Sequence, residues 1–355
     1  MTEFAASLRR FRLRSLVPLI LIVSALPIAP LSLRALNRAV LGAHHNVSYL
    51  PSTEIRRTRK GFGTEPIDTL RHVAPRWVFI GDSMLGTRVH PELLGELSED
   101  GARKVWFLMH AASGPSFWYL SFKNHLVASG VRPRVTFFVF RDTNLTDTMF
   151  RLHNVLGDAL DEVAHEREPE LDAIVAARQR GAWWRIDRVL NAVYEVDTTH
   201  AWLHPTVRRW YALWKYPEPR TRLAFEQLIE DDFNNNFRAD LAADIAATSD
   251  EVDFHRDLPT SVLPLIMELA RQHEMPICFL RVQRRPEGNR PPAQSAALGR
   301  YIAEFRAWAE QQGAFFHDDT GDPEMTLDLY EDGDHVLDRL RYTRILRNRL
   351  DPLFR

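Results

Sequence analysis

Residues 77–84 read Trp-Val-Phe-Ile-Gly-Asp-Ser-Met, and this stretch predicts both a strand and a functional residue. The four apolar residues that begin it are typical of a buried β-strand. Gly81 then lets the chain turn sharply, and Asp82 and Ser83 follow it at once. Ligands of open α/β sheets bind at the carboxyl ends of strands. We therefore expect Ser83 at a ligand-binding edge, with a helix from Met84 whose first amides would suit an oxyanion.

Four more segments share the character of this strand, being short, apolar and bounded by polar residues, Gly or Pro. They are Lys104–His110, Val135–Phe140, Ile277–Val282 and Gly313–His317. Continuous apolar runs of this kind suit strands buried on both faces of a parallel sheet.

Segments with helical spacing of apolar residues alternate with these strands. They are Pro115–Val127, Ser261–His273, Ala293–Gln312 and His335–Leu350. The alternation predicts a doubly wound α/β domain over residues 76–355, with three α/β/α layers, about five parallel strands and a flavodoxin-like arrangement.

A long insertion, residues 145–260, separates the third strand from the fourth. A connection of this length must carry structure of its own, and its sequence is mostly helical in character. Its aromatic residues fit an internal core, or else a lid or a wall that binds an acceptor molecule. They are Trp183, Trp184, Trp202, Trp210, Tyr211 and Trp214.

The start of the chain predicts a membrane anchor. Residues 1–14 contain four arginines, and residues 15–33 contain no charge. As a helix, 19 residues would span about 28 Å, close to the thickness of a bilayer core. The heavier basic flank precedes the apolar run, which favours a single-pass inner-membrane anchor with residues 1–14 in the cytoplasm and the domain in the periplasm. Residues 34–75 would connect them. A cleaved signal peptide and a buried soluble helix are the alternatives.

The composition excludes several classes of protein. The formal net charge of the 355 residues is −2, so no overall field favours nucleic acid. The one cysteine, Cys278, cannot form an internal disulfide or a cysteine-based zinc site. The acidic run at residues 331–334 lacks EF-hand spacing, and residues 317–319 are a weak metal-ligand candidate. The sequence indicates no cofactor and no metal.

Two polar features follow the next two predicted strands. Gly114 precedes Pro115 where the second strand passes into a helix, and a glycine there can bring its N–H close to a ligand. Asn144 follows the third strand, and its uncharged amide is a good donor to an oxyanion. A turn glycine and an Asx turn or helix cap are the structural alternatives. Arg141 could pair with Asp142 or meet an anionic substrate.

A base and its orienting group are predicted near residue 335. Asp332 and His335 are three residues apart. If His335 begins the last helix, Asp332 lies on the loop before it and can accept the imidazole Nδ1–H, which leaves Nε2 for a serine hydroxyl. Asp334 would then be the helix N-cap. A solvated acidic turn is the alternative reading.

The order of these motifs resembles that of the SGNH/GDSL hydrolase superfamily over roughly residues 76–144 and 275–350. The resemblance implies that Ser83 is the nucleophile and that Asp332 and His335 complete a catalytic triad. It also implies that the oxyanion hole comprises Ser83, Gly114 and Asn144. Residues 142–145 read Asp-Thr-Asn-Leu where the superfamily usually has Gly-x-Asn-Asp, and Met84 stands where it often has Leu or Ile.

With its expected anchor, the chain is similar to the cell-envelope acyl-transfer branch, which includes alginate O-acetyltransferase-like proteins and the D-alanine transfer protein. This similarity implies a serine acyltransferase or esterase that acts on O-acyl groups of an envelope glycan, beside a membrane-bound O-acyltransferase. An inactive SGNH-like scaffold that binds polysaccharide or a membrane partner, and a secreted esterase or lipase, are the alternatives.

Overall fold

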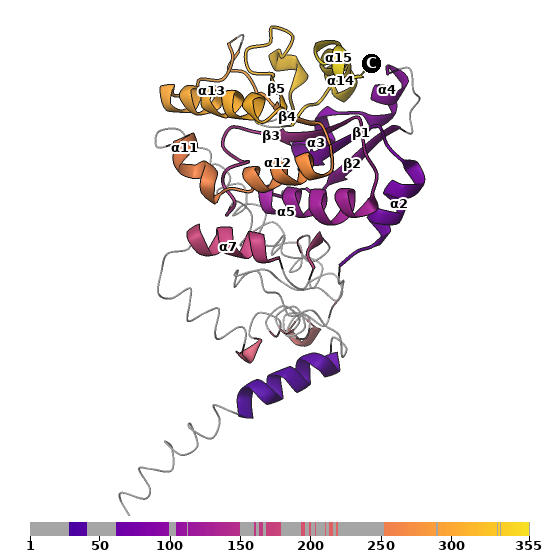
Figure 1. The fold of residues 1–355 in the computed structure, drawn as a ribbon, viewed down its shortest axis with the longest axis vertical. Helices are drawn as coiled ribbons and strands as arrows, with labels where there is room; N and C mark the ends of the chain where they lie inside the picture. The colour runs from indigo at the N-terminus through magenta and orange to yellow at the C-terminus, as the bar shows by residue number, and fades with distance from the viewer. Residues whose placement is uncertain are drawn as a thin grey trace, which may run out of the picture.

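The computed structural model describes most of the predicted α/β domain (Figure 1). The described residues are 28–40, 62–98, 104–111, 113–149, 252–288, 290–331, 333 and 335–354, together with 160, 163–165, 168–178, 193–195, 199, 203, 210, 213–215 and 218 within the long insertion.

Five strands form one parallel sheet in the order β2-β1-β3-β4-β5. The strands are β1 (Trp77–Gly81), β2 (Val105–Met109), β3 (Val135–Phe140), β4 (Ile277–Arg281) and β5 (Phe315–Asp318). All five predicted strands are confirmed, with the last displaced by two residues at its start and by one at its end. The order is that of flavodoxin-like folds, in which the chain reverses direction across the sheet between β1 and β3.

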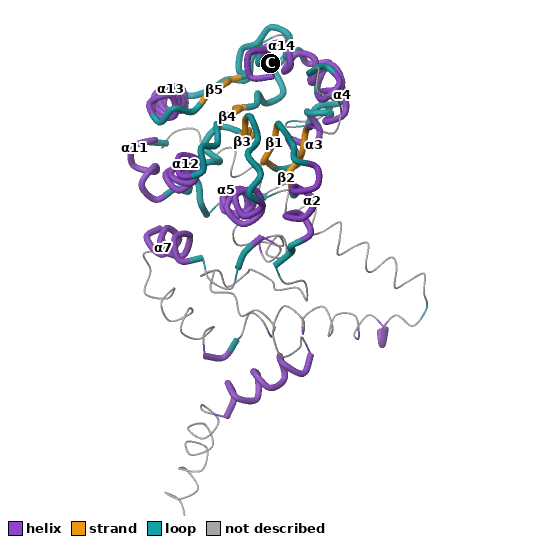
Figure 2. Tube along the Cα trace, turned by 45° about the vertical axis from the view of Figure 1, so that its right-hand side comes forward, coloured by secondary structure: helices purple, strands orange, loops and turns teal. Residues whose placement is uncertain are grey.

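Helices cover both faces of the sheet and give the expected three layers (Figure 2). The core on one face includes residues of α2 (Glu65–Val73), α5 (Pro115–Leu120), the π-helical η2 (Ser121–Val127), α7 (Pro169–Arg178), α11 (Phe254–Asp257), α12 (Leu263–Gln272) and α13 (Ala296–Gln311). The core on the other face includes residues of α3 (Ser83–Arg88), α4 (Pro91–Glu96), η4 (Leu327–Leu329), α14 (Arg339–Arg349) and α15 (Asp351–Phe354). The short η3 (Leu258–Thr260) joins α11 to α12.

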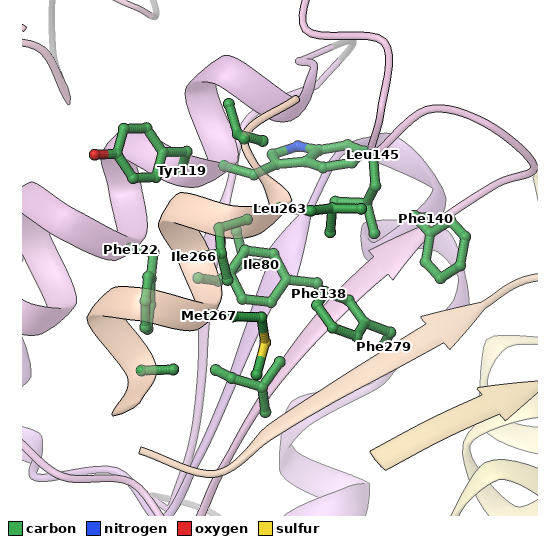
Figure 3. Close-up of a cluster of buried hydrophobic side chains, with 14 of the residues drawn as sticks. Ile80, Tyr119, Phe122, Phe138, Phe140, Leu145, Leu263, Ile266, Met267 and Phe279 are labelled. Carbon is green, nitrogen blue, oxygen red and sulfur yellow. The ribbon is translucent and has the colours of Figure 1, made fainter. Parts of the chain in front are cut away.

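Alternate residues of β1, β2, β3 and β4 enter different cores, because successive side chains of a strand point to opposite faces. Ile80 and Phe138 join the core under α5 and α12, where Leu263 and Ile266 meet them (Figure 3). Phe79 and Phe137 stack at 4.3 Å in the core on the opposite face. The apolar runs of the sequence are therefore explained by burial on both sides of the sheet.

The last helix does not begin at His335 as the sequence suggested. It begins at Arg339, and the side chain of Asp338 accepts a hydrogen bond from the Arg341 amide as its N-cap. His335 instead lies on a tight turn, closed by a bridge between Tyr330 and Val336. Because Val336 forms this bridge, it is not helical, and the helix begins only after it.

The chain before β1 contains α2, which was not predicted within residues 34–75, and Leu70 of this helix lies in the first core. Residues 28–40 are also helical. Within the described residues, none of the helices combines the length and the apolar character needed to cross a bilayer. Residues 15–27 of the expected anchor lie outside the described residues.

Candidate active site

Ser83 is the first residue of α3, directly beyond the carboxyl end of β1. The carboxylate of Asp82 caps this helix by accepting a hydrogen bond from the Met84 amide at 2.9 Å. β1 lies between β2 and β3, so Ser83 stands at the point where the strand order reverses. This is where open α/β sheets bind their ligands.

A close approach of the chain explains Gly81. A Cβ at this position would lie 3.2 Å from Leu85 Cβ and 3.3 Å from both Cβ and the carbonyl oxygen of Val139. The turn that presents Ser83 therefore packs directly against β3.

His335 meets Ser83 across 252 residues of sequence. Its Nε2 lies 3.2 Å from Ser83 Oγ, within hydrogen-bond reach. The turn that carries the imidazole is held by the hydrogen bond from the Glu331 amide to the His335 carbonyl oxygen at 2.9 Å. A serine hydroxyl against an imidazole is the arrangement of a nucleophile and its general base.

Asp332, the expected orienting group for His335, lies outside the described residues. Its neighbour Gly333 accepts a hydrogen bond from the Arg285 amide at 3.0 Å, which joins the histidine turn to the chain after β4.

Arg88 holds the walls of this centre together, a role that the sequence did not suggest. It is only 1% exposed. Its guanidinium donates to the carbonyl oxygens of Met84 at 3.3 Å and Gln283 at 2.9 Å, and lies 5.8 Å from the ring centres of both Tyr330 and Tyr342. Residues 84–89 read Met-Leu-Gly-Thr-Arg-Val, and the one charged residue in this mainly apolar stretch was the signal that could have revealed the role of Arg88.

Gly114 is the buried N-cap residue of α5, beyond the carboxyl end of β2. The preceding Ser113 donates its hydroxyl to the Gly81 carbonyl oxygen at 3.3 Å and accepts from Trp118 Nε1 at 2.9 Å. These bonds fasten the turn after β2 to the turn that presents Ser83.

Asn144 lies on the turn after β3, with its backbone N–H bonded to the Arg141 carbonyl oxygen at 3.0 Å. Its side chain is buried, and among the described residues its Nδ2 has no hydrogen-bond partner. An unpaired buried donor costs about 1–3 kcal/mol, so it calls for an explanation. A developing oxyanion would supply the missing acceptor.

Buried charged side chains cluster at the carboxyl ends of β3, β4 and β5. Arg281 Nη2 donates to Asp142 at 2.8 Å, and Arg281 Nη1 donates to Asp318 at 3.1 Å. Arg284 also pairs with Asp142, and Arg141 Nε lies 3.9 Å from the same carboxylate. Burial disfavours the charged form of Asp142, but the guanidinium groups of Arg284 and Arg281 hold the pKa of its carboxyl below the usual value. Arg141 thus has an ion-pair partner within the protein.

The remaining candidates do not form a second reactive centre. Burial raises the pKa of the Cys278 thiol, which makes it a poor nucleophile. His317 Nε2 lies 3.0 Å from Asp319, and Tyr342 also binds that carboxylate. In the described part of the chain, no three His, Cys, Asp or Glu residues are grouped so that they could hold a metal ion.

No protein-family model and no curated protein matches the sequence. Seven chains of solved structures match this structure, including the following two. One, described as a "putative acylhydrolase" from Bacteroides fragilis, is 10% identical, with a TM-score of 0.35 over 79% of this chain and 88% of the other. A GDSL-like lipase from Bacteroides thetaiotaomicron is 9% identical, with a TM-score of 0.35 over 81% of this chain and 95% of the other. Similarity of this degree does not show that the chain shares their family or activity.

Proposed function

We propose that this chain is a serine acyl-ester enzyme of the SGNH/GDSL type, with Ser83 as nucleophile and His335 as base. The contact between Ser83 Oγ and His335 Nε2 carries the proposal, since a fold alone does not fix a function. The sheet order and the place of Ser83 beyond β1 support it. Asp332, two residues beyond the described Tyr330, is proposed as the carboxylate that orients the imidazole.

In the proposed reaction, His335 Nε2 accepts the hydroxyl proton of Ser83 while Oγ bonds to the carbonyl carbon of an acyl ester. The tetrahedral oxyanion accepts hydrogen bonds from Asn144 Nδ2 and from the N–H groups of Ser83 and Gly114. When the intermediate collapses, the ester C–O bond breaks and the imidazolium returns the proton to the leaving alcohol. A hydroxyl of water or of a sugar then takes the acyl group by the reverse sequence.

We further propose that the acceptor is a cell-envelope glycan and that the domain works in the periplasm, tethered by residues 15–33. The uncharged run and its basic flank support this location. A membrane-bound O-acyltransferase is the proposed source of acyl groups. Incubating the protein with an acyl ester and a glycan tests transfer, because mass spectrometry distinguishes an acylated glycan from free acid.

Substitution of Ser83 and His335 tests the proposed chemistry. We expect Ser83→Ala and His335→Ala to lower turnover of 4-nitrophenyl acetate by at least about 10³-fold, because the nucleophile and base act as one unit. A fluorophosphonate should modify Ser83 in the folded wild-type protein. His255→Ala, which changes an exposed histidine, serves as the control and should leave turnover unchanged.

Undiminished turnover in both Ser83→Ala and His335→Ala would contradict the mechanism. Failure of the fluorophosphonate to modify Ser83 would favour an inactive scaffold.

A further inference from the structure

A small pocket lies at the carboxyl edge of the sheet beside β4. Its volume is about 50 Å³, enough for a few water molecules or one small ionic group but not for a sugar ring. Its polar lining comprises Asp142, Arg281, Arg284, Gln294, Ser295 and Thr320. None of these residues belongs to the proposed catalytic machinery.

Two arginines of this lining keep unused hydrogen-bond donors. Arg281, only 3% exposed, donates through its Nη atoms to Asp142, Asp318 and Gln294. Arg284 pairs with Asp142 through Nη2. The Nε atoms of Arg281 and Arg284 are buried and make no hydrogen bond within the described residues. An unpaired N–H on a buried cation is costly, because the donor has left water without gaining an acceptor.

The surroundings of the pocket are positive. Arg141, Arg281 and Arg284 surround the carboxylate of Asp142, and Arg281 also pairs with Asp318. The connection at residues 281–295 contains four arginines and one glutamate, although the whole chain has a net charge of −2. The N-terminus of the 16-residue α13 adds a partial positive charge, since its N-cap residue Ser295 lines the pocket.

The chain that carries Arg284 is fixed to the catalytic centre. Gln283 accepts hydrogen bonds at its carbonyl oxygen from both Arg88 and Tyr330, and the Arg285 amide donates to Gly333. β4 lies two positions from β1 in the sheet, which corresponds to roughly 10 Å between strand ends. This spacing is short enough for one glycan to reach both the pocket and Ser83.

We propose that this pocket is an anion-binding subsite, which holds a carboxylate or phosphate group of the glycan while its ester lies at Ser83. The inference rests on the proposed function and narrows the substrate to an anionic glycan. The anion accepts from the Nε–H groups of Arg281 and Arg284, which make no hydrogen bond among the described residues. Guanidinium groups suit this task because they remain charged and match the geometry of both anions.

Binding of matched trisaccharides tests the subsite. The ligands are cellotriose, cellotriose oxidised to carboxylates at C6, and cellotriose phosphorylated at C6. Affinities are measured by calorimetry with the full chain carrying Ser83→Ala, so that no turnover occurs. We expect the anionic trisaccharides to bind at least tenfold more tightly than cellotriose, with a preference that weakens in high salt. Whichever anionic trisaccharide binds more tightly shows whether the subsite prefers a carboxylate or a phosphate.

Arg284→Gln should remove this preference, and Arg284→Lys should restore part of it. Arg284 is a quarter exposed in its side chain, so the variants should fold; circular dichroism checks this. Arg132→Gln is the control. Arg132 is exposed, pairs with Glu274 and lies just before β3, at the amino ends of the strands. This variant should keep the preference for anionic trisaccharides.

Equal affinity for cellotriose and its anionic forms would overturn the subsite, and so would an undiminished preference in Arg284→Gln. In either case the cluster only holds the strand ends together. Because binding is measured without the nucleophile, a failure here is distinct from a failure of Ser83 to react with a fluorophosphonate.

Discussion

Among single residues, Asn144 bears most directly on the proposed chemistry, because of the hydrogen bonding of its side-chain amide. Buried donors in folded proteins nearly always find acceptors, yet Nδ2 of this residue has none among the described residues. Folding has therefore already removed this donor from water. In the proposed mechanism, an oxyanion that forms beside Ser83 accepts its hydrogen bond without reorganisation of the site, which is how preorganised donors lower a barrier.

We predict that Asn144→Ala lowers kcat for 4-nitrophenyl acetate by about 10²–10³-fold, the usual effect of removing one oxyanion donor. The free energy of unfolding should change little, because the lost N–H makes no hydrogen bond in the folded protein. Kinetics and urea denaturation measure the two quantities. Wild-type kcat would contradict the assigned role, and a large loss of stability would show that Nδ2 is bonded in solution.

Single residues differ in how far the sequence could reveal them. Ser83 and His335 were predictable because each follows a recognisable strand or turn signal, and parallel strands bring their carboxyl ends to one edge. Arg281 was not, because its partner Asp142 is 139 residues away and no local pattern links the two. Sequence spacing reports local structure, whereas ion pairs across the sheet depend on the tertiary fold.

At the scale of elements, the junction between β1 and α3 sets the position of the nucleophile. A Cβ at Gly81 would lie 3.2 Å from Leu85 and 3.3 Å from Val139, so a side chain there requires these neighbours to shift. Any displacement of this junction moves Ser83 relative to His335, which is held by a separate turn. The geometry of the pair thus depends on the packing of β1 against β3.

We predict that Gly81→Ala destabilises the protein by about 1–3 kcal/mol, because the added methyl group overpacks a full site. Turnover should fall by roughly 10–100-fold as Ser83 is displaced. Gly299→Ala is the matched control, since a Cβ there meets nothing within 4 Å. In the interior of α13 this change should instead stabilise by about 0.5–1 kcal/mol and leave turnover unchanged. Thermal unfolding measures the stability of the two variants, and initial rates measure their turnover. Equal effects of Gly81→Ala and Gly299→Ala would contradict the role of close packing at Gly81.

Element boundaries were harder to predict than element types. The segment from Ser83 to Glu96 is two helices rather than one, because Pro91 begins α4 and His90 caps it. Residues 115–127 are helical as expected but pass from α5 into a π-helical stretch. The start of α14 was misplaced because Asp334 and Asp338 are equally good N-caps by residue type, and the Tyr330–Val336 bridge selects the second.

Across the whole molecule, one sheet supports two cores. Phe254 stacks on Phe305 at 5.4 Å in the core on the α12 and α13 face. Phe354 stacks on Phe137 at 5.5 Å in the core on the α14 face. Adjacent residues of β1, β2, β3 and β4 enter opposite cores. Neither core can therefore open without disturbing the strands on which the other core is built. This arrangement predicts that the two cores unfold as one cooperative unit.

We predict that Phe254→Ala and Phe354→Ala each lower the unfolding free energy by about 3–5 kcal/mol, the usual effect of removing a buried ring. Each should also speed hydrogen exchange on both faces, because global opening then dominates exchange of the β3 amides. Mass spectrometry of peptides from β3, α12 and α14 measures this. Leu337→Ala, which changes a side chain 67% exposed, is the control and should alter none of them. If Phe354→Ala speeds exchange in α14 while α12 keeps its wild-type protection, the two cores are energetically separate and the shared sheet does not couple them.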